Sequence, residues 1–294
     1  LHSLGKANQK IEAYSRALDQ EIEKCRQIQM SFLPKKLPQL PGWHIEEFFF
    51  PATRVSGDFY DAFLLPGGYV GLVIGDVCDK GVGSALFMAL FRSLLRIFSG
   101  QTHLCQHLCE SFINASQKKA GDLIIQPETA AVEQTNPLSA VSLTNEYIAQ
   151  DNEMSMFATL FFGVLNPKNG QLFYVNGGHE AVFIIDQKGV RERLMATGPS
   201  VGIFEEAKFT YKEIQLQPGE ILFAYTDGVI DARTPEGDRF SKKRLDALLS
   251  QPMDNALDLM QRIATSLFEH IGMAPQEDDI TMLTVQRKNS NKSD

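Results

Sequence analysis

The chain has 294 residues, 44% of them hydrophobic and 22% charged, which is an ordinary globular composition with room for one large domain or two modest ones. Its net charge of −8, without a basic stripe, argues against nucleic acid as a partner, and its apolar runs are too short to span a bilayer. Four scattered cysteines argue against a disulfide framework and favour a reducing cytoplasm.

Residues 1–33 predict a coiled-coil-like linker or dimerisation helix. One apolar series recurs every seven residues: Leu4, Ile11, Leu18, Cys25 and Phe32. A second heptad series on the same face of the helix contains Ala7, Tyr14 and Ile28, with Glu21, beside Ile22, as its exception. The helix either pairs with another helix, as in a homodimer, or lies on its own domain. It shows no signal-peptide pattern. Because the first residue is not Met, it is open whether the chain is a fragment of a longer protein.

The prolines of "LPKKLPQLPGW" end this helix, and strands follow it. "HIEEFFF" and "YVGLVIGDV" have the texture of strands. Residues 84–99 predict a mostly buried helix, with Arg92 and Arg96 one turn apart on one side.

Residues 100–136 lose this periodicity in a polar segment with Gly and Pro, which predicts an insertion or flap. Two histidines and two cysteines alternate at its start: His103, Cys105, His107 and Cys109. An ordinary soluble helix explains this spacing better than a zinc site does.

From Pro137 onward, a further helix and a series of short strands separated by turns are expected. Two helices at about 242–249 and 256–271 then lead to a last strand and a polar tail at 289–294. Strand clusters interrupted by helix pairs are typical of an α+β fold, with antiparallel sheets covered by helices.

Carboxylates stand where the apolar runs begin or end. Five of them do so: Asp58, Asp76, Asp227, Asp278 and Asp279. Any single one is ordinary turn chemistry. Together they outnumber the nearby cations, Arg54 and Lys80, and a buried ionised carboxylate needs a partner. Oxygen ligands without a Cys or His cluster select hard cations such as Mg²⁺ or Mn²⁺.

The order of motifs is similar to that of one bacterial enzyme family. Seven blocks occur in order: "RQIQMSFLP", "RVSGDFYDAF", "IGDVCDKGVGSALFMA", "FATLFFGVLNPKNGQLFYVNGGHE", "GPSVGIF", "GEILFAYTDGVIDARTPEGDRF" and "EDDITMLTVQR". Over about residues 25–287, less the 100–136 segment, the chain resembles the SpoIIE-like or RsbU-like branch of the PPM (PP2C-type) metal-dependent serine/threonine phosphatases. The resemblance implies a domain at residues 34–288, a sandwich of two antiparallel sheets flanked by helices, with two Mn²⁺ or Mg²⁺ ions at one end.

The resemblance also implies the metal ligands: Asp58, Asp76, the backbone carbonyl of Val77, Asp227, Asp278 and Asp279. Asp58 would hold one ion, Asp76 would bridge both, and Asp227 would hold the other. The "DDIT" alignment gives the ligand role to Asp278 and a supporting role to Asp279, or the reverse. Asp61 is left with a structural role. A metal-bridging water would attack phosphorus in line, so no catalytic side chain is required.

Some positions depart from the family pattern or have an open role. Ser56 replaces the first Gly of Gly-Gly-Asp, and Cys78-Asp79 stands where Ser-Gly is common. Asp79 could add negative charge near the centre. Cys78 occupies the position of a histidine proposed as general acid in eukaryotic relatives, which leaves that role to metal-bound water. Gly228 and His179 are possible supporting residues, although a turn histidine bonded to backbone is the preferred interpretation of His179.

The implied function is removal of phosphate from serine or threonine of a partner signalling protein. In the family this substrate is often an anti-sigma-factor antagonist, and the N-terminal helix commonly follows a sensory or receiver domain. Two alternatives share the fold. A non-catalytic module could sequester a partner, although retention of all the acidic positions argues against it. A hydrolase of small phosphoesters would differ only in how open its cleft is.

Overall fold

The computed structural model describes residues 2–101, 136–150, 152–253 and 255–289. The predicted insertion or flap, with the two histidines and two cysteines at its start, lies almost entirely outside the described residues, as does most of the polar tail. Within the described ranges, no helix is long and apolar enough to cross a membrane.

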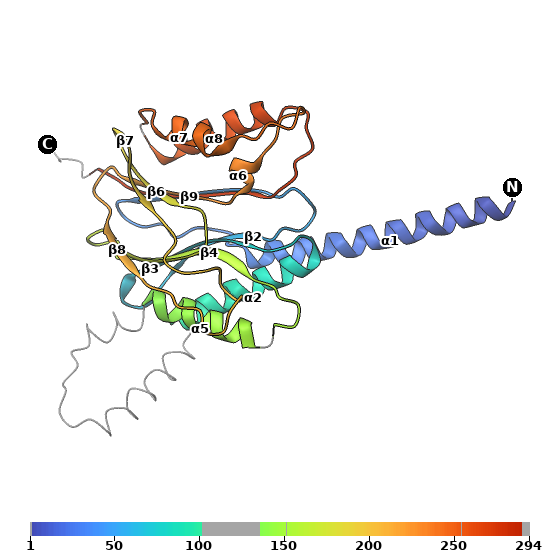
Figure 1. The fold of residues 1–294 in the computed structure, drawn as a ribbon, viewed down its shortest axis with the longest axis horizontal. Helices are drawn as coiled ribbons and strands as arrows, with labels where there is room; N and C mark the ends of the chain where they lie inside the picture. The colour runs from blue at the N-terminus through green and yellow to red at the C-terminus, as the bar shows by residue number, and fades with distance from the viewer. Residues whose placement is uncertain (1, 102–135, 151, 254, 290–294) are drawn as a thin grey trace, which may run out of the picture.

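Two five-stranded antiparallel sheets pack face to face (Figure 1). One runs in the order β1 (Trp43–Phe50), β10 (Ile280–Arg287), β9 (Ile221–Tyr225), β6 (Val182–Asp186) and β7 (Gly189–Leu194). The other runs in the order β2 (Asp58–Leu64), β3 (Val70–Val77), β4 (Ala158–Leu165), β5 (Gln171–Gly177) and β8 (Lys212–Gln215). The α+β sandwich expected from the sequence is thus confirmed.

Helices cover the outer face of each sheet (Figure 1). The β2–β8 sheet is covered by α2 (Val82–Phe98) and α5 (Pro137–Gln150). The β1–β7 sheet is covered by α6 (Gly228–Asp231), α7 (Ser241–Leu249) and α8 (Ala256–Ile271), and a 3₁₀ turn, η1 (Pro66–Gly68), joins β2 to β3. Because both faces of the central strands are buried, those strands consist of nearly continuous apolar residues.

A buried ion cluster holds α2 on its sheet. Asp61 of β2 is fully buried and accepts hydrogen bonds from Arg96, with Nε at 2.6 Å from Oδ2 and Nη2 at 2.7 Å from Oδ1. The Arg92 Nε lies 2.8 Å from the same Oδ2, and the Arg96 guanidinium also lies 4.6 Å from the centre of the Phe63 ring. The two arginines on one side of the predicted helix therefore converge on Asp61, which has the structural role expected for it.

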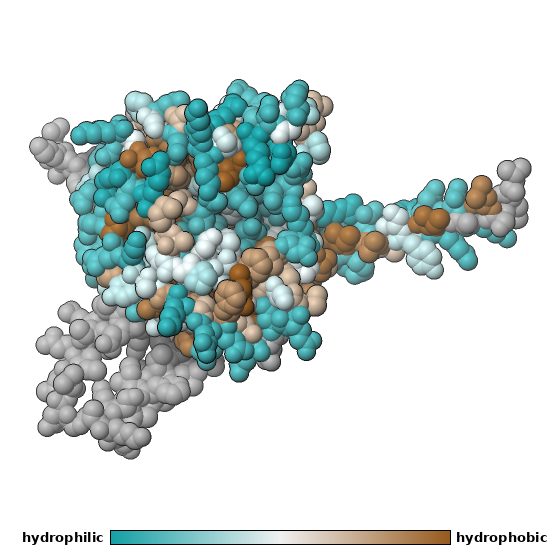
Figure 2. Space-filling view, in the orientation of Figure 1, coloured by the Kyte–Doolittle hydropathy of each residue, from teal (hydrophilic) through white to brown (hydrophobic). Residues whose placement is uncertain are grey.

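The N-terminal helix, α1 (His2–Phe32), extends away from the sandwich (Figure 1). All residues from 8 to 21 are exposed, whereas Gln29 in the last turn is buried. Figure 2 shows apolar patches along the projecting part. Heptad residues Ile11, Leu18 and Tyr14 are 65%, 63% and 74% exposed, so the projecting turns do not lie on their own domain.

Candidate metal centre

Strand pairing brings the predicted acids to one end of the sandwich. Asp58 begins β2 and faces Asp76 of β3 in the antiparallel register. In the other sheet β9 pairs with β10, so Asp227, which follows β9, comes close to the Asp278–Asp279 pair that precedes β10. Sheet topology alone thus gathers carboxylates that are up to 221 positions apart in the printed sequence.

Asp58 is buried and also links the two sheets. Its Oδ2 accepts a hydrogen bond of 2.7 Å from Thr226 Oγ1 and one of 2.6 Å from Thr281 Oγ1, both across the sandwich. These hydroxyls orient the carboxylate. Sequence reasoning missed both threonines, although each lies close in sequence to a predicted ligand, in "YTDG" and "DDIT".

Three acids of this end have raised pKa values. Burial, and then the charges of Asp227 and Asp278, raises the pKa of Asp76 to about 7. Burial, and then the charge of Asp76, raises the pKa of Asp58 well above its ordinary value. The pKa of Asp227 is raised by burial and then by Asp278. Carboxylates that resist ionisation in this way would be stabilised by bound cations.

The two nearby cations compensate little of this charge. Lys80 Nζ lies 3.0 Å from Asp278 Oδ1 and also donates to the Glu277 carbonyl. Arg54 instead forms an ion pair with Asp19 of α1, at 2.9 Å. The acid cluster therefore keeps a net negative charge.

The neighbouring aspartates 278 and 279 have different surroundings. Asp279 is buried, with Oδ1 accepting from Ala52 N at 2.7 Å and Oδ2 accepting from Ser56 Oγ at 2.7 Å and Gly57 N at 3.1 Å. The Asp278 side chain is 42% exposed and contacts Lys80. Asp278 is therefore the one that can turn to a ligand, while Asp279 is held by the protein.

Two glycines let the backbone come close to this end. A Cβ at Gly57 would lie 2.7 Å from the Val77 carbonyl oxygen, and one at Gly228 would lie 1.9 Å from the Asp279 carbonyl oxygen. A side chain at either position would force apart the segments that carry the acids. The absence of a side chain at Gly228 thus permits the close approach of the Asp279 backbone.

The residues present fit hard divalent cations. Among the described residues, no three His, Cys, Asp or Glu side chains lie close enough together to hold an ion without adjustment. The donors are all oxygens, they carry excess negative charge, and the Val77 carbonyl lies among them, which is the chemistry that Mg²⁺ and Mn²⁺ require.

A match to a known family model decides the identity of this arrangement. The model described as "Stage II sporulation protein E (SpoIIE)" matches residues 66–288, which include both sheets from β3 onward. The chain belongs to the SpoIIE family of PP2C-type phosphatases.

Proteins similar to this chain differ in length. Protein IcfG of Synechocystis is 47% identical over 275 residues, covering 91% of this chain but 41% of IcfG. Phosphoserine phosphatase RsbU of Bacillus subtilis is 26% identical over 283 residues, covering 96% of this chain and 74% of RsbU. The solved SiaA-PP2C domain of Pseudomonas aeruginosa shares the fold, with a TM-score of 0.71, 19% identity, and coverage of 93% and 98%.

Three further candidate residues of this SpoIIE-family chain have other partners. Cys78 is half-buried, and its Sγ accepts a hydrogen bond of 3.2 Å from Phe157 N. Exposed Asp79 has a φ of 67° and accepts from Lys80 N at 2.8 Å, which keeps its carboxylate within its own turn. His179 is buried, and its Nδ1 lies 3.0 Å from Thr159 Oγ1, on the residue opposite Asp76.

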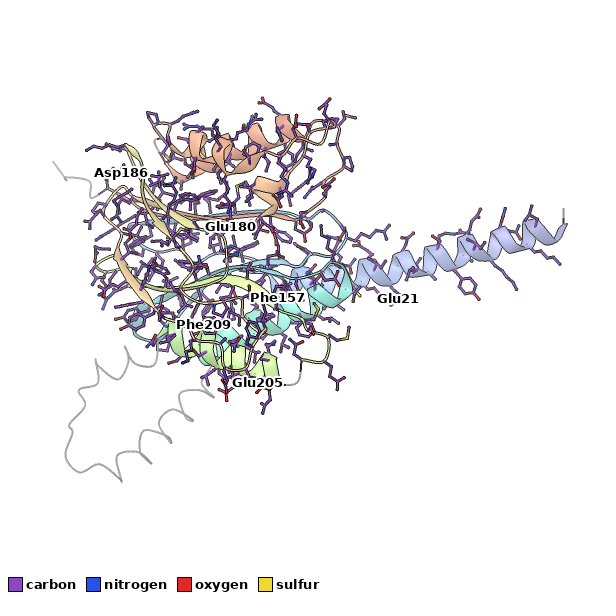
Figure 3. All side chains as sticks on the ribbon, viewed as in Figure 1. Glu21, Phe157, Glu180, Asp186, Glu205 and Phe209 are labelled. Carbon is purple, nitrogen blue, oxygen red and sulfur yellow. The ribbon has the colours of Figure 1, made fainter. Side chains whose placement is uncertain are left out.

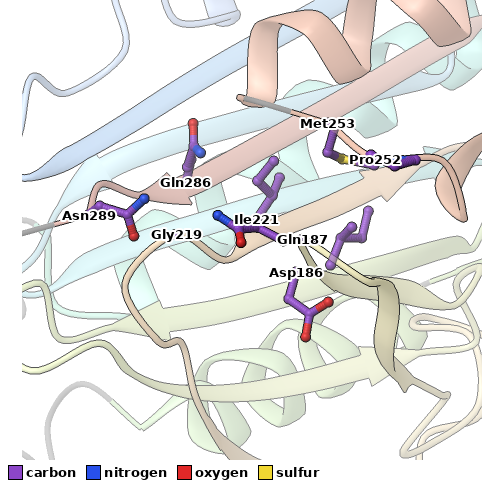
Figure 4. A pocket seen from close by; sticks show the side chains of 9 residues that line it. Asp186, Gln187, Gly219, Ile221, Pro252, Met253, Gln286 and Asn289 are labelled. Carbon is purple, nitrogen blue, oxygen red and sulfur yellow. The ribbon is translucent and has the colours of Figure 1, made fainter.

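A separate pocket lies at the opposite end of the β1–β7 sheet. Figure 3 labels Glu180, which precedes β6 at the end of the sheet where the acids lie, and Asp186, which ends β6 at the far end of the sheet. Figure 4 shows the pocket at the far end, about 320 Å³ in volume, with Asp186, Ile221 and Gln286 in its wall. None of the predicted site residues lines it.

Proposed function

We propose that this protein is a metal-dependent protein serine/threonine phosphatase that removes phosphate from a partner signalling protein. The observation that supports this most is the cluster of Asp58, Asp76, Asp227 and Asp278 at one end of a PP2C-type sandwich, in which Asp278 pairs with Lys80 and the pKa values of the other three are raised. RsbU, named a phosphoserine phosphatase, aligns with nearly all of the chain. A cytoplasmic location is part of the same proposal.

Two Mn²⁺ or Mg²⁺ ions fit this centre. Asp58 would hold one ion, Asp76 and the Val77 carbonyl would lie between the two, and Asp227 with Asp278 would hold the other, while Asp279 supports the backbone. Ions bound there supply an activated water as nucleophile and offset charge on the phosphoryl oxygens.

Cys78 and His179 supply neither another nucleophile nor a charged acid to this centre. Burial raises the pKa of the Cys78 thiol, so the thiol stays protonated at neutral pH. Burial lowers the pKa of His179 to about 4, so its imidazole is neutral and holds Thr159 beside Asp76. The leaving serine or threonine oxygen would therefore take its proton from water.

We further propose that α1 joins two copies of the chain and connects each to an upstream sensory or receiver domain. The exposed heptad series on the projecting helix supports pairing with a second helix, because leaving these apolar side chains in contact with water is unfavourable. This chain spans only 41% of IcfG, which leaves room for another domain in that relative. An anti-sigma-factor antagonist is the substrate class that we would test first.

Hydrolysis of a phosphoserine peptide and of a generic aryl phosphate, each with Mn²⁺ and with EDTA, tests the proposal. We expect metal-dependent turnover that falls at least about 100-fold in Asp76→Asn and Asp227→Asn, because both variants remove charge from the ions. Turnover that is metal-independent, or full in both variants, would contradict the metal centre. A folded protein without any turnover would favour the non-catalytic module, and preference for the aryl phosphate would favour a small-molecule hydrolase.

A further inference from the structure

Ser56 contacts the carboxylate cluster from its protein side. The residue is 1% exposed, and its hydroxyl donates to Asp279 Oδ2 at 2.7 Å while accepting a hydrogen bond of 3.1 Å from Asp58 N. One hydroxyl thus connects two segments that lie 223 positions apart and that each carry a proposed ligand, Asp58 itself and Asp278 beside Asp279.

Gln29, in the last turn of α1, holds Ser56 in place. Its amide donates to the Ser56 carbonyl and accepts a hydrogen bond of 3.0 Å from Ser56 N. Gln29 is only 4% exposed, so both bonds are shielded from water. A buried side-chain amide that satisfies both backbone groups of one residue fixes that residue in position and orientation.

We propose that Gln29 and Ser56 are positioning residues for the metal centre. Gln29 fixes the Ser56 backbone, and the Ser56 hydroxyl fixes both the start of β2 at Asp58 and the carboxylate of Asp279. This arrangement holds the Asp279 carboxylate against the protein and fixes the backbone of Asp58 where its side chain could bind an ion. The inference rests on the proposed metal-dependent function and adds two residues that do not touch the ions.

The expected effect of removing Gln29 or Ser56 on metal binding follows from what is known of groups that orient metal ligands. Removing such a group typically costs 10- to 100-fold in metal affinity or activity. Because Gln29 acts through Ser56, the two losses should not multiply. Two unrelated packing defects, in contrast, would multiply.

The test is calorimetric titration of Mn²⁺ into the metal-free chain for the starting protein, Ser56→Ala, Gln29→Ala and the double variant. Ser84→Ala is the matched control, since its hydroxyl is as deeply buried but bonds only Gly81 O, at 2.9 Å. We expect the Mn²⁺ Kd to rise about 10- to 100-fold in each single variant. In the double variant the Kd should rise no further than in the more strongly affected single variant. In the control it should rise less than about 2-fold.

Amide exchange in EDTA gives a readout that is independent of bound metal. Exchange over residues 52–60 should be faster in Ser56→Ala than in Ser84→Ala, because Asp58 N loses its acceptor. A Mn²⁺ Kd within 2-fold of the starting protein in a folded Ser56→Ala chain would overturn the inference alone, as would strict multiplication in the double variant. A starting protein that binds no Mn²⁺ would overturn the proposed function, and this inference with it.

Discussion

At the scale of single residues, the candidate centre depends on acids that are costly to ionise where they stand. The sequence was sufficient to locate them, because each one interrupts or borders an apolar run that has to be buried. It was not sufficient to find the groups that hold them. Thr226, Thr281 and Ser56 reach their carboxylates across the sandwich, and that proximity exists only after the two sheets have packed.

The raised pKa of Asp76 makes the metal-free protein sensitive to pH. The folded-state pKa of about 7 exceeds the ordinary 3.8, so between these values the folded state binds more protons and its free energy of unfolding falls as pH rises. We expect urea unfolding in EDTA to show a loss on the order of a few kcal/mol across this window. The loss should be smaller in Asp76→Asn, where the raised pKa values of Asp58 and Asp227 still contribute.

Comparison with Asp76→Asn separates the contribution of Asp76 to the pH dependence of stability from that of His179, which has the opposite sign. The pKa of His179, lowered to about 4, makes stability rise with pH below about 6.5 in both proteins. Mn²⁺ should raise stability most above pH 7, where Asp76 is ionised. Equal pH slopes in the two metal-free proteins would contradict the assignment of the shift to Asp76.

At the scale of elements, the sandwich and its covering helices could be predicted, whereas one edge strand could not. β7 carries Arg191, Glu192 and Arg193 on its exposed part, so its sequence lacks the apolar alternation that signals a strand. Charged edge strands avoid pairing with other chains, which explains that composition. Helix α2 was expected at 84–99 and begins two residues earlier, at Val82.

The attachment of α2 through Asp61 should matter more to stability than any surface ion pair. Asp61→Ala leaves Arg92 and Arg96 without their buried partner, and we expect it to lower the free energy of unfolding by about 3–5 kcal/mol. Asp246→Ala is the control, because its pair with Arg193 is exposed and should contribute at most about 1 kcal/mol. Denaturant titration in EDTA measures both, and similar losses in the two variants would argue against the anchoring role.

At the scale of the whole molecule, α1 gives the protein two distinct parts, a projecting helix and a sandwich that its last turn contacts (Figure 1). The heptad pattern predicted this helix well, since the side chains of residues 8–21 are all exposed and their contact with the sandwich through Asp19 and Arg54 lies outside the heptad series. The heptad pattern could not show that Gln29 in the last turn bonds to Ser56, because that contact depends on how the chain between α1 and β2 folds back against the helix.

Oligomeric state should depend on the heptad series of α1. We expect sedimentation to show a dimer that becomes a monomer in Ile11→Asp/Leu18→Asp, because charge at both seam positions opposes helix pairing. Lys10→Asp/Gln20→Asp changes exposed positions outside the series and should stay dimeric. A starting protein that is monomeric at high micromolar concentration would contradict the dimer.

The two threonine hydroxyls on Asp58 limit how that carboxylate can coordinate an ion. Both lone-pair directions of Oδ2 are taken by Thr226 and Thr281, which leaves Oδ1 as the atom that would bind an ion. Ca²⁺ favours bidentate carboxylates and six to eight oxygens, whereas Mg²⁺ is held in octahedral geometry by few carboxylates and keeps several waters. The Thr226–Asp58–Thr281 bridge that joins the two sheets would therefore disfavour Ca²⁺ at this position, and the choice of ion would depend on the packing of the sandwich core.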